Sequence, residues 1–421
     1  MKQLILVSLF LLPASWLCAE NPSSDWTQWR GNNRDSVAQG TWPTELSPEK
    51  LKVVWSKSFG PSYSGPIVLG DTVFTTETRN EKDEVVFALD RKTGEKKWST
   101  EWTGAMKVPF FAAKNGSWIR ATPATDGKRL YVAGMLGKLV CLDVKTGDEV
   151  WSVDFAERYG VARESFGHVC SPLIIEQDEA KDPYMYIQCN AGFLKMNRLT
   201  GEEVWRVLDS GQNMMSSGAF SSPFVATVAG KKQILVQTRT DLAGVDIESG
   251  KVLWKQPVPN FRGMNILTPT VYGDMVFTSS YNHRSFGFGI SKDGNGFAVE
   301  EKWTAPSKAY MSSPVIIGDD VYMHLQSKRI ASINLKTGET NWVSRTKKRF
   351  GDYWSMVSNG NQILALDSRG ILYLMKANPK EFELIGEAKL DTNDSWAHLA
   401  IVDNLIYVRG LDSLVVYEWS K

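Results

Sequence analysis

A short motif that recurs about every 50 residues constrains the fold of this chain more than any other feature. The pattern is Asp or Asn, two residues, Thr or Ser, Gly, three residues and Trp. Five good copies end at Trp98, Trp151, Trp205, Trp254 and Trp342, and two degenerate copies end at Trp55 and Trp303. Successive tryptophans lie 39 to 54 residues apart, which is the period of a four-stranded propeller blade with loop insertions of variable length.

Each position of the motif has a physical role in a β-hairpin. Apolar residues alternate before Asp90 and Asp143, as in a strand, and the Asp side chain is placed to accept backbone N–H groups in a tight turn. The glycine supplies a left-handed conformation, and the tryptophan on the next strand is large enough to cover the seam between blades. We therefore assign a structural role to the blade tryptophans, which are Trp55, Trp98, Trp151, Trp205, Trp254, Trp303 and Trp342.

A second repeated element, small residues followed by Pro and a strand, precedes each motif. It reads SGPIVL at 64–69 and SSPVII at 312–317, and counting its intact and decayed copies gives eight inner strands. The last copy supplies only three strands before the chain ends, and the segment 51–59 with Trp55 is available as the fourth. The sequence thus predicts an all-β fold, a single eight-bladed β-propeller of four-stranded antiparallel blades over 51–421, closed by the N-terminal strand joining the last blade.

The segments before the propeller predict export. Residues 1–19 combine Lys2, an apolar run and a small-residue end, the pattern of a signal peptide, and residues 20–50 form an N-terminal arm expected to pack across one face of the propeller. No later stretch is long and apolar enough to span a membrane, so we expect a periplasmic or secreted monomer. Lys plus Arg total 48 against 47 for Asp plus Glu, which gives no electrostatic footprint for nucleic acid.

Cysteine and histidine spacing indicates neither a metal nor a haem site. Cys170 and Cys189 fall on either side of one predicted hairpin, so a cross-strand disulfide and two buried free thiols are both compatible with the sequence. No zinc-type spacing, P-loop or nucleophile motif is present, and no metal ligand is assigned.

The motif resembles the PQQ-like repeat, the blade motif of bacterial quinoprotein alcohol dehydrogenases and of BamB-like outer-membrane assembly proteins. The resemblance covers nearly the whole mature chain and implies the propeller fold, but the family includes enzymes and non-enzymes. For the quinoprotein enzymes of the family, the resemblance implies a quinone bound on the propeller axis. It also implies an adjacent Cys-Cys pair and a set of Glu, Asn and Asp residues around calcium. This sequence has no adjacent cysteines and no CxxCH, and its blades leave no room for long cofactor-covering inserts.

The axial funnel is the predicted binding site. Residues just upstream of the inner strands should ring one mouth of the channel, and they are mainly aromatic with a few polar and charged groups. The alternative is that most of them only fill the crowded axis. The candidates are Tyr63, Trp118, Arg120, His168, Phe220, Asn265, Tyr310, Asp352, Trp354, Trp396 and His398, with Met214 and Met215 on an adjoining loop.

These observations favour a non-catalytic scaffold that binds a protein, peptide or glycan at the loop face, with no cofactor. The alternative is a PQQ-dependent oxidoreductase without the paired cysteines, using calcium. In that enzyme the quinone would stack on Trp354 or Trp396, Arg120 would bind a carboxylate of the quinone, and Asp352 would be the candidate catalytic base. A third class, a sugar-processing enzyme with paired carboxylates from different blades, stays open.

Overall fold

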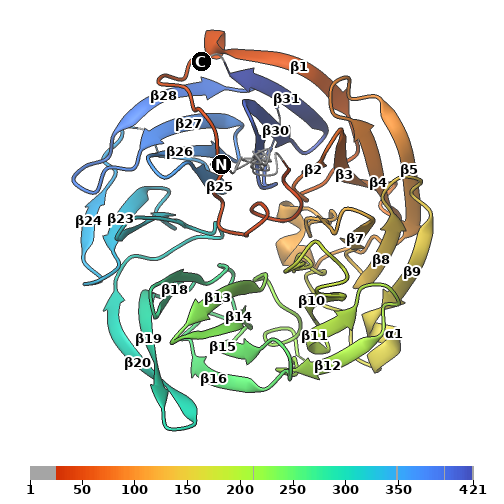
Figure 1. Cartoon of the computed structure of the whole chain (residues 1–421). Helices are drawn as coiled ribbons and strands as arrows, with labels where there is room; N and C mark the ends of the chain where they lie inside the picture. Colours follow the sequence, from red (N-terminus) through yellow and green to blue (C-terminus); the bar gives the residue numbers. More distant parts are fainter. Residues whose placement is uncertain (1–24, 212, 348, 393, 420–421) are drawn as a thin grey trace, which may run out of the picture.

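The computed structural model describes residues 25–211, 213–347, 349–392 and 394–419. These residues form eight antiparallel sheets arranged as blades around a central axis, as Figure 1 shows. The predicted eight-bladed β-propeller is therefore confirmed. The expected signal peptide, 1–19, lies outside the described residues, as do the first residues of the arm.

Blades 1 to 4 follow one another along the chain, each running from the axis outward. Blade 1 contains β2 (Ile67–Leu69), β3 (Thr72–Arg79), β4 (Asp83–Asp90) and β5 (Lys96–Thr103). Blade 2 contains β6 (Ala124–Thr125), β7 (Arg129–Ala133), β8 (Lys138–Asp143) and β9 (Glu149–Asp154). Blade 3 contains β10 (Tyr184–Cys189), β11 (Gly192–Asn197) and β12 (Glu203–Val207), and blade 4 contains β13 (Phe224–Val228), β14 (Lys231–Gln237), β15 (Asp241–Asp246) and β16 (Val252–Pro257).

Blades 5 to 8 complete the ring. Blade 5 contains β17 (Thr270–Tyr272), β18 (Met275–Ser279), β19 (Ser285–Asp293) and β20 (Gly296–Ala305), and blade 6 contains β21 (Val315–Ile317), β22 (Asp320–His324), β23 (Ile330–Asn334) and β24 (Thr340–Val343). Blade 7 contains β25 (Trp354–Ser358), β26 (Gln362–Asp367), β27 (Ile371–Lys376) and β28 (Leu384–Lys389). Blade 8 contains β29 (Ala400–Val402), β30 (Leu405–Arg409), β31 (Ser413–Trp419) and β1 (Leu51–Ser58). The described helical segments are η1 (Pro48–Lys50), η2 (Phe110–Asn115) and α1 (Phe155–Tyr159).

The first and last strands close the ring. β1 pairs antiparallel with β31 from Leu51 opposite Trp419 to Ser58 opposite Ser413. The N-terminal strand is thus the outer strand of the last blade, as the sequence predicts. This pairing covers the edge that a three-stranded last blade would leave open.

Blade 3 has a shortened inner strand. In place of a fourth strand it has one bridge, in which Leu173 and Tyr186 exchange backbone hydrogen bonds of 2.9 and 3.0 Å. The pairing does not continue along the segment, and Cys170 and Cys189 are not joined. Both are free, buried thiols, the second of the two sequence alternatives. The Sγ of Cys170 accepts the backbone N–H of Gln188 at 3.4 Å, and burial raises the pKa of its thiol to about 12.

The outer seams repeat one contact between the Trp of one blade and the turn of the next. The indole N–H of Trp98 donates to the carbonyl of Val144 in the next blade at 2.9 Å, and five of the other blade tryptophans make the equivalent bond. The ring lies over the turn glycine, so that a Cβ built on Gly147 would meet Trp98 at 2.5 Å. That glycine also has φ of 78°, which favours glycine for a second reason. Trp254 differs, because its N–H donates to Gln233 of its own blade at 2.7 Å.

The inner strands are joined by small hydroxyl side chains that precede the strands. The backbone N–H of Thr122 in blade 2 donates to Ser171 Oγ in blade 3 at 3.0 Å, and the N–H of Ser171 donates to Ser222 Oγ in blade 4 at 3.0 Å. Two more such bonds run in the opposite direction around the ring. The backbone N–H of Trp354 in blade 7 donates to Ser312 Oγ in blade 6, and that of Leu399 in blade 8 donates to Ser355 Oγ in blade 7. The small residues before Pro are therefore needed both for space and as hydrogen-bond acceptors at the crowded axis.

The described part of the arm enters the channel instead of lying across one face. Figure 1 shows the red-orange N-terminal segment crossing the centre of the ring on its way to β1. Its hydrogen bonds reach inner segments of seven blades, at Val68, Thr125, Ile174, Pro223, Pro314, Ser358 and His398. Arg34, which is 1% exposed, donates to the carbonyls of Ser171, Pro172 and Pro223. The arm is therefore an integral plug of the axis.

No helix in the described part of the chain is long and apolar enough to cross a membrane.

Candidate binding funnel at the ring axis

A cavity of about 560 Å³ opens at the loop face of the axis, above the plug. Its wall is built from the residues that lead into the inner strands. In six blades, the third residue before the Pro of the second repeated element lines the cavity, and these residues are Tyr63, Arg120, Val169, Phe220, Ile266 and Met311. The residue directly before the Pro lines it more than once as well, as at Thr122 and Ser171. We call this cavity the funnel.

The funnel brings together seven of the eleven sequence candidates. They are Tyr63, Arg120, Phe220, Tyr310, Trp354, Trp396 and His398, and Met214 and Met215 line it from their loop. Trp118 lines a neighbouring hollow instead. His168, Asn265 and Asp352 do not line the funnel.

Side-chain alternation explains where His168 and Asn265 lie. Each directly precedes a lining residue, Val169 and Ile266, and in an extended segment neighbouring side chains point to opposite sides. His168 is 1% exposed and lies between Glu164, at 3.0 Å, and the Cys170 carbonyl, at 2.8 Å. Asn265 is 2% exposed and donates to the Arg239 carbonyl at 3.2 Å. Both are therefore loop-supporting residues.

Asp352 and Trp354 have surroundings unlike those expected of a base and a stacking platform. Asp352 forms an ion pair with Lys328 at 2.7 Å. Trp354 contributes to the wall but is only 4% exposed, stacked between His324 and Tyr373 with ring centroids 5.2 and 5.3 Å away. Most of its ring is therefore already covered by the protein.

A belt of aromatic side chains surrounds the funnel. Trp396 stacks on Tyr353 at 3.7 Å and on Tyr63 at 4.6 Å, and Tyr310 meets Tyr353 edge-on at 5.5 Å. The belt continues from Tyr310 through Tyr281 to Phe261, and on the other side Phe111, Phe166 and Phe220 contact one another in sequence. The sequence analysis missed Phe111, Phe166, Arg239, Phe261, Arg262, Tyr281 and Tyr353. Of these, Tyr353 directly follows a candidate, whereas Tyr281 lies in a hairpin turn where no repeated signal marks it.

Three arginines line the funnel, and no described lining residue is Asp or Glu. Arg120 donates to the carbonyls of Gly116 at 2.9 Å and Trp118 at 3.3 Å. Arg239, 3% exposed, donates to the carbonyls of Ser217 and Gly263, and its guanidinium lies 4.1 Å from the Phe220 ring centroid. Burial lowers the pKa of Arg239 to about 10, so it stays positively charged at neutral pH. The funnel is therefore electropositive.

The arm supplies part of the funnel wall. Trp29 lines the cavity, meets His398 edge-on at 5.9 Å and lies 5.6 Å from the guanidinium of Arg30. His398 Nδ1–H donates to its neighbour's carbonyl at 2.8 Å, which leaves Nε2 to accept from Ser36 Oγ at 3.3 Å. Burial, with the charge of Arg30, lowers the pKa of His398 to about 3. This histidine is therefore neutral and packs the arm against blade 8.

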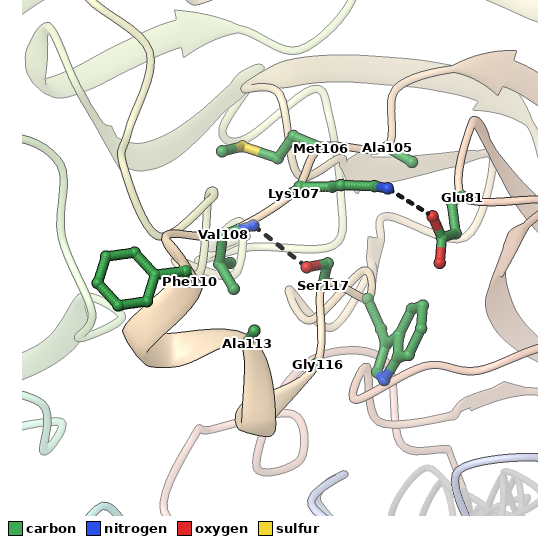
Figure 2. A pocket seen from close by; sticks show the side chains of 10 residues that line it. Glu81, Ala105, Met106, Lys107, Val108, Phe110, Ala113, Gly116 and Ser117 are labelled. Atoms are coloured by element: carbon green, nitrogen blue, oxygen red, sulfur yellow. Dashed lines mark hydrogen bonds and ion pairs between the residues drawn. The ribbon is translucent and has the colours of Figure 1, made fainter.

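A second hollow, of about 400 Å³, lies beside the funnel and shares Val108 and Gly116 with it. Figure 2 shows its lining around η2, with the Lys107–Glu81 ion pair of 3.0 Å on one side and Ser117 accepting the Val108 N–H. Phe110 points outward from η2 in the same view and is 91% exposed. The two hollows thus form one continuous uneven surface at the loop face.

The lining does not fit a calcium-bound quinone. Calcium takes oxygen ligands, usually including carboxylates, and none of the described lining residues carries one. Among the described residues there is also no group of three or more His, Cys, Asp or Glu side chains placed to hold a metal ion. The same lack of carboxylates leaves the funnel without the acid–base pair of a sugar-processing enzyme.

Repeat, blade number and axial cavity define the chain as a PQQ-like repeat β-propeller. A family model described as "Outer membrane protein assembly factor BamB" matches residues 38–100 and 82–344. The chain therefore belongs to the BamB family.

Known proteins of more than one kind resemble this chain. The outer membrane protein assembly factor BamB of Moranella endobia (strain PCIT) is 22% identical over 366 residues, 82% of this chain and 84% of its own length. The crystal structure of BamB from Moraxella catarrhalis superposes with a TM-score of 0.62 at 16% identity, covering 88% of this chain and 98% of that one. The quinohemoprotein alcohol dehydrogenase ADH-IIG of Pseudomonas putida is 23% identical over 288 residues, 63% of this chain but 38% of its own length.

Proposed function

We propose that this chain is an exported, non-catalytic scaffold that binds a protein partner or a peptide at its loop face, through the funnel. The observation that carries the proposal is a concave aromatic wall with three arginines and no described carboxylate. Such a wall supplies apolar contact and anion recognition, but its described residues include no carboxylate pair for acid–base chemistry or for binding a metal ion. Its BamB relatives are named as assembly factors, which supports a binding role over a catalytic one.

The scaffold is tested by removing funnel side chains whose loss leaves the blade cores intact. Trp396 is suited to this, because it is partly exposed and stacks only on funnel residues that the structure describes. We expect the Arg120→Ala/Trp396→Ala variant of the mature chain to recover at least about tenfold less partner from periplasmic extract.

Lys145→Ala, a charge removal in an exposed blade turn, is the matched control. Its partner recovery should equal that of the wild type, and both variants should be folded at the assay temperature, as checked by thermal unfolding. Equal recovery by the funnel variant and the control would overturn binding through the funnel.

The oxidoreductase alternative draws support from the partial similarity to a quinohemoprotein alcohol dehydrogenase. It predicts that PQQ with Ca²⁺ raises the melting temperature of the purified chain and that quinone absorbance survives desalting. We expect neither effect, because the described lining lacks carboxylates. A saturable shift with retained colour would replace the scaffold proposal with the oxidoreductase.

A further inference from the structure

Exposed apolar side chains gather at the mouth of the funnel. Phe110 is 91% exposed and Phe111 59%, both on η2, and Met214, Met215 and Phe261 are between 37% and 42% exposed on two other loops. Four of them line the funnel, and Phe110 lines the neighbouring hollow. We call these five residues the mouth cluster. Exposed apolar surface gathered on one face marks an interaction site, and methionine adapts to varied partners.

The mouth cluster extends the surface beyond the funnel itself. The funnel and the hollow of Figure 2 share Val108 and Gly116, so they lie side by side next to η2. Together they offer apolar depressions separated by polar backbone. This arrangement suits an extended chain with side chains at intervals better than it suits one compact small molecule.

The positive charge of the funnel indicates the sign of the charge on its ligand. Arg120 and Arg239 are held by backbone carbonyls, which fix their positions without neutralising them. Arg262 is exposed and forms no ion pair with any described residue. It lies 5.1 Å from the Phe261 ring. None of the three arginines forms an ion pair with a described residue, although the charge of Glu164 acts on Arg239 and partly offsets the lowering of its pKa by burial.

Nearby carboxylates already have partners. Asp352 pairs with Lys328 at 2.7 Å, Glu164 contacts His168 at 3.0 Å, and Asp394 accepts the Trp396 indole N–H at 3.1 Å. None of these three lines the funnel. The wall therefore presents arginines without directly paired carboxylates, which favours a ligand that carries negative charge.

We propose, building on the scaffold function above, that the funnel and mouth cluster bind an extended peptide segment in which carboxylates alternate with aromatic or aliphatic side chains. A carboxylate pairs with the exposed Arg262, while Arg120 and Arg239 supply fixed positive charge in the wall. The apolar side chains contact the mouth cluster and the hollow beside η2. A glycan is disfavoured as the ligand, because its hydroxyls need acceptors as well as donors and the described wall offers no carboxylate.

The test uses the mature chain and three fluorescent peptides of equal length, read by anisotropy. One alternates Glu with Phe, one Lys with Phe, and one Glu with Ser. We expect the Glu–Phe peptide to bind at least about tenfold more tightly than either of the others, with an affinity that falls as salt rises. Equal binding of the Lys–Phe peptide overturns charge recognition, and equal binding of the Glu–Ser peptide overturns the role of the mouth cluster.

Surface variants that leave the core intact locate the site. Arg262→Gln and Phe110→Ser should each lower the affinity for the Glu–Phe peptide about three- to tenfold. Arg262→Gln should also make that affinity less dependent on salt. The matched controls are Lys145→Gln for the charge and Val150→Ser, on an exposed outer-strand position, for the apolar surface. Control variants that weaken binding as much as Arg262→Gln and Phe110→Ser would overturn the assignment.

The outcomes separate this inference from the scaffold proposal. If the Glu–Phe peptide fails to bind while partner recovery still requires Arg120 and Trp396, the funnel is a scaffold for a different chemistry and the inference is wrong. If partner recovery is also independent of Arg120 and Trp396, the scaffold proposal itself fails.

Discussion

The outer seams and the axis of this propeller are built in opposite ways. At the seams the same contact recurs, a tryptophan ring over a glycine with an indole N–H bonded to the next turn, as at Trp98 and Gly147. At the axis each blade contributes a different side chain, and the arm adds Trp29 and Arg34 from outside the repeat. The repeat thus holds the ring together, while the residues leading into the inner strands are free to vary and to bind.

The largest effect should come from the plug. Arg34→Ala removes the donors to the carbonyls of Ser171, Pro172 and Pro223 at a site with no access to water. We expect a loss of about 3–5 kcal/mol in the free energy of unfolding, since each buried unsatisfied group costs about 1–3 kcal/mol. Urea unfolding measures it, and Arg262→Ala, at an exposed position, should change it by less than about 0.5 kcal/mol. A small loss in Arg34→Ala would show that the axis does not depend on the arm.

A paired glycine substitution tests the seam. Gly201 and Gly137 both have positive φ, 74° and 80°, so Ala strains the backbone at each by about 1 kcal/mol. Only at Gly201 would the new Cβ meet a ring, Trp151 at 2.7 Å, whereas Gly137 has no atom within 4 Å. Thermal unfolding should show Gly201→Ala less stable than Gly137→Ala by about 1–2 kcal/mol. Equal losses of stability in the two variants would mean that the Trp151 ring moves aside without a measurable loss of stability.

The uniformity of the seams can be tested with the indole hydrogen bonds. Trp98→Phe and Trp342→Phe each remove one bond of 2.9 Å to a carbonyl of the following segment. Both should lose about 1–1.5 kcal/mol in chemical unfolding, mostly from the unsatisfied carbonyl. If the two losses differ by more than about 0.5 kcal/mol, the seams are not equivalent and the comparison with the axis weakens.

The last prediction concerns acid, and the size of its effect depends on pH. Burial holds the pKa of His398 at about 3, below its ordinary value of 6.5, so the unfolded chain binds this proton first as pH falls. The contribution of His398 is therefore fully present above about pH 6.5 and is lost as pH falls toward 3, by at most about 1.4 kcal/mol per pH unit. His398→Asn should show a shallower decline of melting temperature between pH 6.5 and 4 than the wild type. An identical decline would mean that other groups govern acid unfolding.

The fold could be predicted from the sequence because its determinants are local. Asp90, Gly94 and Trp98 act within one hairpin and its neighbour, and repetition shows which positions matter. The funnel was predicted less well, because one residue along an extended segment reverses the side chain. Val169 and Ile266 line the cavity, whereas His168 and Asn265, one position earlier, support the loops. The third residue before each Pro was the available signal.

The remaining lining residues carry no such signal. Phe111 lies on a short 3-10 helix and Arg239 follows β14 at a turn, so only the assembled ring brings them to one cavity. The path of the arm was equally hidden, because Arg30 and Arg34 look like solvent-exposed residues in a polar segment. Their partners, main-chain carbonyls of Pro314 and Pro223, leave no trace in the sequence.

The pairing of β1 with β31 has a kinetic consequence. It joins residues at opposite ends of the propeller, Leu51 and Trp419, so closure must overcome the entropy of the longest loop in the domain. Interior blades are made of contiguous hairpins and can form as soon as their segments emerge, whereas the last blade waits for the final strand. Until then, both sheet edges at the opening stay exposed. Refolding should therefore end in a slow step that brings Trp55 and Trp419 to their final environments together, and that interval is when an unfinished ring is most open to aggregation.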